Sequence, residues 1–170
     1  VLENSGCGFV RPGSEGMEYV LVPADRSGSG QDIVITESDI KNLLRAKGAI
    51  FAGIRSMLQM VDMELDAIER VYIAGGFGNY MNITDAVNIG LMPDLPVEKY
   101  RYVGNSSLHG AVAVLLSRDA LEEIHEIAGK MTYLELSAGN RFMEEFISAL
   151  FIPHTDLGLF PSVEKEPNRK

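Results

Sequence analysis

Three glycines follow directly on an apolar run near the middle of the chain. The stretch VYIAGGFGNYM, Val71 to Met81, places Gly75, Gly76 and Gly78 after a predicted buried strand. Glycines at such a place permit a tight turn, a phosphate-binding loop, or a bare surface against the flat face of a nucleotide. The dinucleotide-binding pattern G-x-G-x-x-G needs a glycine where Met81 stands, and no G-K-[ST] follows. Both phosphate templates fail, which leaves the turn and the nucleotide-facing surface.

A second strand-to-helix junction, YVGNSSLHGAVAVL, also carries residues that could do chemistry. Gly104, Asn105 and Ser106 begin like the G-x-S-x-G nucleophile elbow, but Leu108 occupies the place of the second glycine. His109 could be imagined as a base, yet a lone histidine near a helix start is far more often a surface residue. No catalytic residue is therefore expected in this chain.

Lys47 is the third unusual residue. At 100° per residue it falls in the middle of an apolar helical face, between Leu43/Leu44 and Ile50/Phe51. An unpaired buried ammonium costs several kcal/mol, on the order of the penalty for any unpaired charge. The side chain must therefore extend to solvent, pair with a carboxylate, or meet a bound anion.

Composition limits the classes of function. The 170 residues are 46% hydrophobic and 23% charged, with 15 basic against 24 acidic side chains and a formal charge of −9. This acidic excess argues against nucleic-acid binding. No apolar run reaches the roughly 20 residues of a membrane span, and no signal peptide is evident. Cys7 stands alone, which suits the cytoplasm and argues against an intramolecular disulfide and against an all-cysteine metal or iron–sulfur site within this chain.

Strands and helices alternate along most of the sequence, which predicts an α/β fold with a mixed sheet flanked by helices. The two strands that end in glycine turns should be parallel neighbours. One domain is expected over 1–163, with a mobile or strap-like lead-in over 1–16, and a polar tail is expected over 164–170. Strands are predicted over 17–24, 32–36, 70–74, 100–104 and 131–137, and helices over 38–62, 82–90, 106–130 (broken near 117–118) and 140–150.

Several stretches resemble one known family. LLRAKGAIFAGI, VYIAGGFGNYMN, AVNIGLMPDLP, VGNSSLHGA and LELS are similar to the C-terminal region of the iron–sulfur proteins that reductively activate corrinoid proteins, from about Ile33 to Val163. That region belongs to the superfamily of actin, sugar kinases and heat-shock chaperone ATPases. The resemblance implies a ribonuclease H-like, actin-like ATPase half-domain. AKGAI and AGGFGNY are its most specific stretches.

The resemblance also implies a nucleotide site. In that superfamily, a strand that ends in a glycine pair presents bare backbone to adenine and ribose. The residues implied to contact ATP with Mg²⁺ are Gly75, Gly76, Phe77, Gly78, Asn79, Gly104 and Asn105. Lys47 is predicted to point toward the same turn. No residue is expected to bind a metal directly.

Two parts of the family's pattern are not found: the Asp-containing phosphate motifs and the four-cysteine ferredoxin domain. The chain, which begins with Val1, is therefore expected to be the C-terminal portion of a longer protein that carries its iron–sulfur cluster upstream. The implied function is ATP-dependent reduction of Co(II) to Co(I) in a corrinoid protein or corrinoid-dependent methyltransferase, with a homodimer possible. The alternatives are a docking or dimerisation module with a vestigial nucleotide site, and part of a small-molecule kinase.

Overall fold

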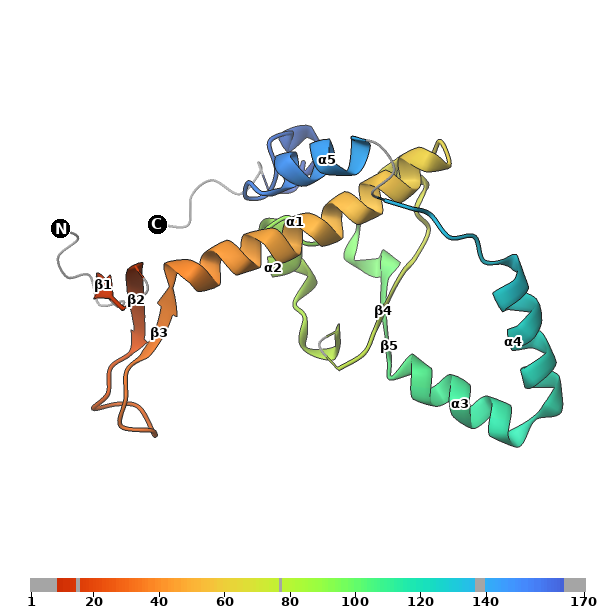
Figure 1. The fold of residues 1–170 in the computed structure, drawn as a ribbon, viewed down its shortest axis with the longest axis horizontal. Coiled ribbons are helices and arrows are strands. Elements are labelled where there is room, and N and C mark those ends of the chain that lie inside the picture. The colour runs from red at the N-terminus through yellow and green to blue at the C-terminus, as the bar shows by residue number, and fades with distance from the viewer. Residues whose placement is uncertain (1–8, 15, 77, 137–139, 164–170) are drawn as a thin grey trace. The chain divides into compact units, whose positions relative to one another are not determined.

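The computed structural model describes residues 9–14, 16–76, 78–136 and 140–163. The chain divides into two compact units, Val1–Lys47 and Gly48–Lys170, and the boundary falls inside one long helix. Strands and helices are both present, as the predicted α/β class requires (Figure 1). None of the described helices is long and apolar enough to cross a membrane.

The strands of the first unit form an antiparallel sheet in the order β1-β2-β3 (Figure 1). They span Val10–Gly13, Gly16–Val22 and Ile33–Thr36. Arg11 donates to Glu18 at 2.6 Å and forms an ion pair with Asp32 at 2.7 Å, which ties β1 to the segments beside it. The predicted mobile or strap-like lead-in over 1–16 contains strand β1, which was not predicted because a four-residue strand is defined by its partner rather than by its own sequence.

Helix α1 spans Glu37–Met60, within two residues of the predicted bounds at each end. Its start is fixed by a reciprocal pair of contacts: the Asp39 backbone N–H donates to Thr36 Oγ1 at 3.1 Å, and the Thr36 N–H donates to Asp39 Oδ2 at 2.9 Å. Asp62, with φ of 53°, follows its end. A single left-handed residue at this position is a common helix terminator.

The second unit contains the two strands that precede the glycine turns. β4 (Val71–Ala74) and β5 (Tyr100–Gly104) are paired in parallel, which confirms the predicted pairing. α2 (Ile83–Asn88) lies between them in sequence, and α3 (Ser106–Leu116) follows β5. The core of this unit is apolar and continuous, formed by Phe51, Ile73, Ile83, Val87, Leu95, Tyr100, Ala149 and Phe160.

Two glycines allow close packing around this core. Helix α5 (Arg141–Ala149) approaches α1 at Gly48, where an added Cβ would lie 3.3 Å from the Ala149 carbonyl oxygen. Gly90 has φ of 74°, and a Cβ there would overlap the carbonyl group of Pro153. Both positions therefore favour glycine for packing, and Gly90 requires it for its backbone conformation as well.

Helices α3 and α4 (Arg118–Lys130) form a hairpin (Figure 1). Ser117 ends α3 and caps α4, since its hydroxyl accepts from the Ala120 N–H at 3.3 Å; this confirms the predicted break. Every residue of these two helices is described, and none of them is buried. The strand predicted over 131–137 was wrong, because residues 131–136 are not assigned to a strand and alternation alone supplies no neighbouring strand to bond. Ser137 lies outside the described residues.

Candidate functional site

Two glycine turns lie together at the carboxyl ends of β4 and β5. The register pairs Ala74 with Gly104, and the Gly75 N–H donates to the Gly104 carbonyl oxygen at 2.8 Å. The carboxyl end of parallel strands is the edge at which open α/β sheets bind their ligands. The structure therefore brings together two motifs that are distant in the sequence and were expected to form one site.

The glycines of the site have different reasons to be glycine. Gly75 and Gly104 adopt φ angles of 90° and 63°, which residues other than glycine rarely adopt. Gly78 is buried, and a Cβ there would overlap the side chain of Ile73. Gly76 has neither a positive φ nor a described atom within 4 Å of an added Cβ. Among the glycines of the site, Gly76 is thus the one that neither its backbone conformation nor its packing against described residues requires to be glycine.

The structure describes the three other predicted residues to different extents. Asn105 caps α3, since its Oδ1 accepts from the Leu108 N–H at 3.0 Å. Its side-chain NH₂ group has no acceptor among the described residues, so the cap leaves a donor for a ligand. Asn79 lies in the short 3₁₀ helix Gly78–Tyr80, where only its backbone is described. Phe77 lies outside the described residues.

Sequence reasoning missed the contacts that hold the turns in place. The Tyr102 hydroxyl donates to the Met81 carbonyl oxygen at 2.5 Å, which joins β5 to the chain after the first turn. Lys99 donates to the carbonyl oxygens of Ile68 and Asp66, just before β4. Alternating residues on β5 were the available signal for Tyr102, but its acceptor is a backbone carbonyl that no sequence pattern marks.

Lys47 is completely buried, with 0% of its surface exposed. This excludes the orientation in which its ammonium extends to solvent. Burial lowers the pKa of Lys47 from 10.5 to about 8, because a low-dielectric environment disfavours the charged form. Its predicted approach to the glycine turns stays a prediction, since Lys47 and the turns belong to different units.

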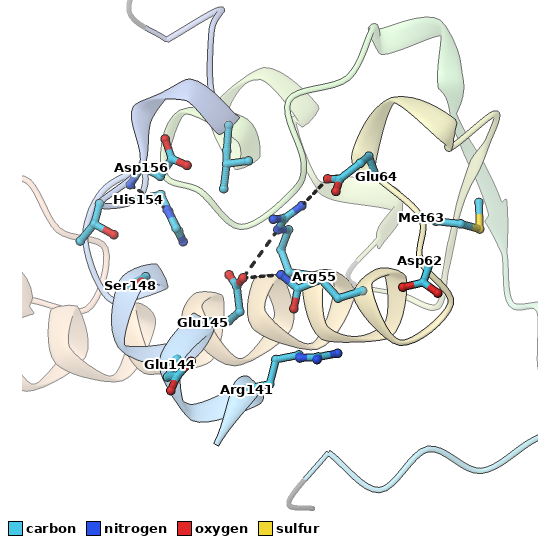
Figure 2. Close-up of a pocket in the computed structure, with 13 residues that line it drawn as sticks. Arg55, Asp62, Met63, Glu64, Arg141, Glu144, Glu145, Ser148, His154 and Asp156 are labelled. Carbon is cyan, nitrogen blue, oxygen red and sulfur yellow. Dashed lines mark hydrogen bonds and ion pairs between the residues drawn. The ribbon is translucent and has the colours of Figure 1, made fainter. Parts of the chain in front are cut away.

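A separate pocket of about 670 Å³ lies between α1, α5 and the chain after α5 (Figure 2). Arg55 is at its centre and forms ion pairs with Glu64 at 3.4 Å and Glu145 at 4.0 Å. Gln59 also donates to Glu145, at 2.7 Å. These groups pair their charges within the unit, but Arg55 Nε is buried and makes no hydrogen bond among the described residues. Across the described residues, no three His, Cys, Asp or Glu side chains are grouped to hold a metal ion.

Comparison with known proteins agrees with the geometry. Residues 3–164 match the C-terminal domain of RACo, the ASKHA domain. The corrinoid activation enzyme RamQ of Eubacterium limosum is 31% identical over 129 residues, 76% of this chain and 22% of that protein. The Co(II) methylated amine-specific corrinoid protein reductase of Methanosarcina barkeri is 29% identical over 135 residues, 78% of this chain and 25% of that protein.

A solved structure of a related protein is also similar to this chain. The reductive activator for corrinoid, iron-sulfur protein superposes with a TM-score of 0.85 at 65% identity, over 91% of this chain and 24% of that one. The chain thus spans about a quarter of the length of the relatives it matches. At this identity and coverage the likeness extends to the strands, turns and helices described above. The chain belongs to the family of RACo C-terminal ASKHA domains.

Proposed function

We propose that this chain is the nucleotide-binding portion of an ATP-dependent activator that reduces the Co(II) corrinoid of a partner protein to Co(I). The observation that carries the proposal is the open backbone at Gly76, beside the Gly104 turn at the carboxyl ends of two parallel strands. The relatives support the chemistry, since two are named for corrinoid activation and one for Co(II) corrinoid protein reduction.

The residues fit an adenosine group. Gly76 offers a surface that a Cβ would fill, and Asn105 offers side-chain N–H donors at the neighbouring Gly104 turn. Gly75 and Gly78 hold the turn in shape, and Phe77 and Asn79 complete the proposed contact. Lys47 is proposed to meet the bound nucleotide with its ammonium. The Mg²⁺ ion and the phosphate contacts are assigned to other parts of the longer protein.

The cobalt step itself is a one-electron transfer. In the longer protein, an iron–sulfur cluster would supply the single electron that reduces Co(II) to Co(I). ATP drives this step only if it binds one conformation of the activator–corrinoid complex more tightly than another. The role of this chain is then to convert nucleotide binding into that preference. The corrinoid partner is either a corrinoid protein or a corrinoid-dependent methyltransferase.

Gly76→Val in the full-length protein tests the nucleotide site. The new Cβ meets no described atom within 4 Å, so the midpoint of thermal unfolding should change little. Binding of ATP should weaken by about tenfold or more, which corresponds to about 1.4 kcal/mol. Gly28→Val is the matched control, because Gly28 is also open among the described atoms and has no positive φ. Equal ATP affinity in both variants and the unaltered protein would falsify the assignment.

A second experiment tests the activity. The full-length protein, reduced chemically, is mixed with the Co(II) form of the corrinoid protein, and formation of Co(I) is followed by its absorbance. The proposal expects Co(I) to accumulate with ATP and much less without it. ATP turnover with a small-molecule acceptor and no corrinoid protein present would favour the kinase alternative. Binding of the corrinoid protein without any effect of ATP would favour a docking module.

A further inference from the structure

A second pocket of about 450 Å³ lies between α1 and the start of α5, away from the glycine turns. Ser56 of α1 lines it and is 2% exposed. The Ser56 hydroxyl oxygen has no hydrogen-bond partner among the described residues. Serine inside a helix often bonds to the carbonyl four residues earlier, and this one does not. A buried hydroxyl without a partner costs free energy. The Oγ atom is itself buried, so an occupant of the pocket would gain this hydrogen bond once the Ser56 side chain rotates toward it.

Residues at the beginning of α5 also line the pocket. Arg141 is the first residue of the helix and lines the pocket. Its guanidinium has no hydrogen bond or ion pair within the part of the chain that the structure describes. Asn140 stands at the cap position, but its side chain makes no capping hydrogen bond to the described helix. The first-turn N–H groups of any α-helix lack helical acceptors and carry partial positive charge.

Helix α5 itself supplies no ion-pair partner for the Arg141 guanidinium. Glu144 and Glu145 follow it by three and four residues, which are the usual partner positions on a helix surface. Glu145 instead interacts with Arg55 and Gln59. Figure 2 shows Arg141 extending from the start of α5 on the side away from Glu144. Arg141 lines both the pocket that Ser56 lines and the pocket of about 670 Å³ shown in Figure 2, and its guanidinium has no partner on its own helix.

We propose that this pocket binds a small molecule through an oxyanion, either a carboxylate or a phosphate ester. The Ser56 hydroxyl, the Arg141 guanidinium and the first-turn amides of α5 are the donors. Met60, Leu136 and Phe142 supply apolar walls, so the ligand carries a short apolar body. One carboxylate, Glu135, also lines the pocket and accepts a hydrogen bond from the Tyr133 hydroxyl at 2.7 Å. Its negative charge lowers the affinity for a bare inorganic anion.

The test uses the full-length protein and two probes, inorganic phosphate and 4-hydroxybutyrate, titrated at constant ionic strength by calorimetry. Saturable binding of at least one probe is expected. Arg141→Gln should weaken it by about tenfold, since it removes a charge-assisted contact, and Ser56→Ala by about threefold to tenfold. Arg141 is exposed and Ser56→Ala introduces a smaller side chain, so both variants keep the fold.

Arg118→Gln is the matched control. Arg118 is likewise the first residue of a helix, α4, but the Ser117 hydroxyl already caps that helix. This change should leave probe affinity within about twofold. Saturation by phosphate alone assigns a phosphate ester, and saturation by 4-hydroxybutyrate alone assigns a carboxylate. Absence of saturation by either probe overturns the proposal, as does an equal loss in all three variants.

The proposal does not depend on the nucleotide site. Gly76→Val should leave probe binding unchanged, and Arg141→Gln should leave ATP binding unchanged. Competition between ATP and the probe for one site would show that the oxyanion is a nucleotide phosphate, which overturns the assignment of a separate site. Failure of ATP binding with intact probe binding would contradict the proposed function alone.

Discussion

Two helix pairs in the second unit bury very different fractions of their apolar side chains. Where α1 packs on α5, Phe51 and Ala149 are both 0% exposed. In the α3–α4 hairpin, Leu115 and Leu116 are 84% and 82% exposed. Apolar residues at helical spacing thus specify a helix in both places, but only one pair has its apolar face covered within the described chain. The stability of the unit should accordingly reside in α1, α5 and their neighbours.

The largest expected effect separates these two pairs directly. In the 170-residue chain, Phe51→Ala should lower the free energy of unfolding by about 3–5 kcal/mol, because it removes a buried aromatic ring and leaves a cavity. Leu115→Ala should change it by about 0.5 kcal/mol or less, because the side chain is already in water. Urea denaturation measures both. Similar losses in the two variants would show that α3 is covered in solution and would remove the contrast.

Two glycines give a second contrast of opposite sign. Gly90→Ala should destabilise the chain by about 2–4 kcal/mol, because the new Cβ overlaps Pro153 and the backbone has a positive φ. Gly110→Ala in α3 should stabilise it by about 0.5–1 kcal/mol, because an added Cβ meets no described atom within 4 Å and alanine favours the helix. The midpoint of denaturation should move in opposite directions. A shift in the same direction would contradict the described packing.

Lys47 provides a pH-dependent effect. Its pKa is lowered to about 8 by burial, so the folded chain binds fewer protons than the unfolded chain between about pH 8 and 10.5. Stability relative to Lys47→Met should therefore rise by about 1–3 kcal/mol as pH increases through this window. Denaturation at about pH 7, 8, 9 and 10 measures the difference. A difference that is flat over this range would contradict the lowered pKa.

A charge-matched control comes from the hairpin. Lys130 lies exposed on α4 and pairs with Glu126 at 2.6 Å. Lys130→Met should cost about 0.5 kcal/mol or less at neutral pH, as expected for an exposed ion pair on a helix. If Lys47→Met also weakens ATP binding in the full-length protein, Lys47 contacts the nucleotide. A change in stability alone would make it a structural residue.

Local sequence patterns were sufficient to predict the helices and turns, because these depend on interactions between residues close in the sequence. The apolar stripe gave α1 within two residues, Ser117 marked the break between α3 and α4, and the glycine turns indicated two parallel strands. β1 was missed, and a strand over 131–137 was wrongly predicted, because strand formation depends on the neighbouring strand. Whether an extended segment finds one is not contained in its own residues.

The candidate site shows the same limit. The sequence identified the glycines as a group. Why each position is glycine became clear only from the φ angles and neighbouring atoms, which distinguish Gly76 from Gly75 and Gly78. Ser56 and Arg141 are 85 residues apart and carry no motif that connects them. A serine four residues after Ala52 on the buried face of α1 was the only signal, and it indicates a polar atom in the core rather than a pocket.

The hydrogen bond from Gly75 to Gly104 also has a mechanical consequence. It joins the first turn to Gly104, which lies just before α3. A ligand that shifts Gly76 would therefore also shift the start of this helix. α3 has 11 residues and is therefore about 16 Å long. A rotation of about 10° at its base would displace its far end by about 3 Å, a lever geometry over that length. Any rotation of the turn would therefore produce its largest displacement at the far end of α3, where the exposed hairpin turns.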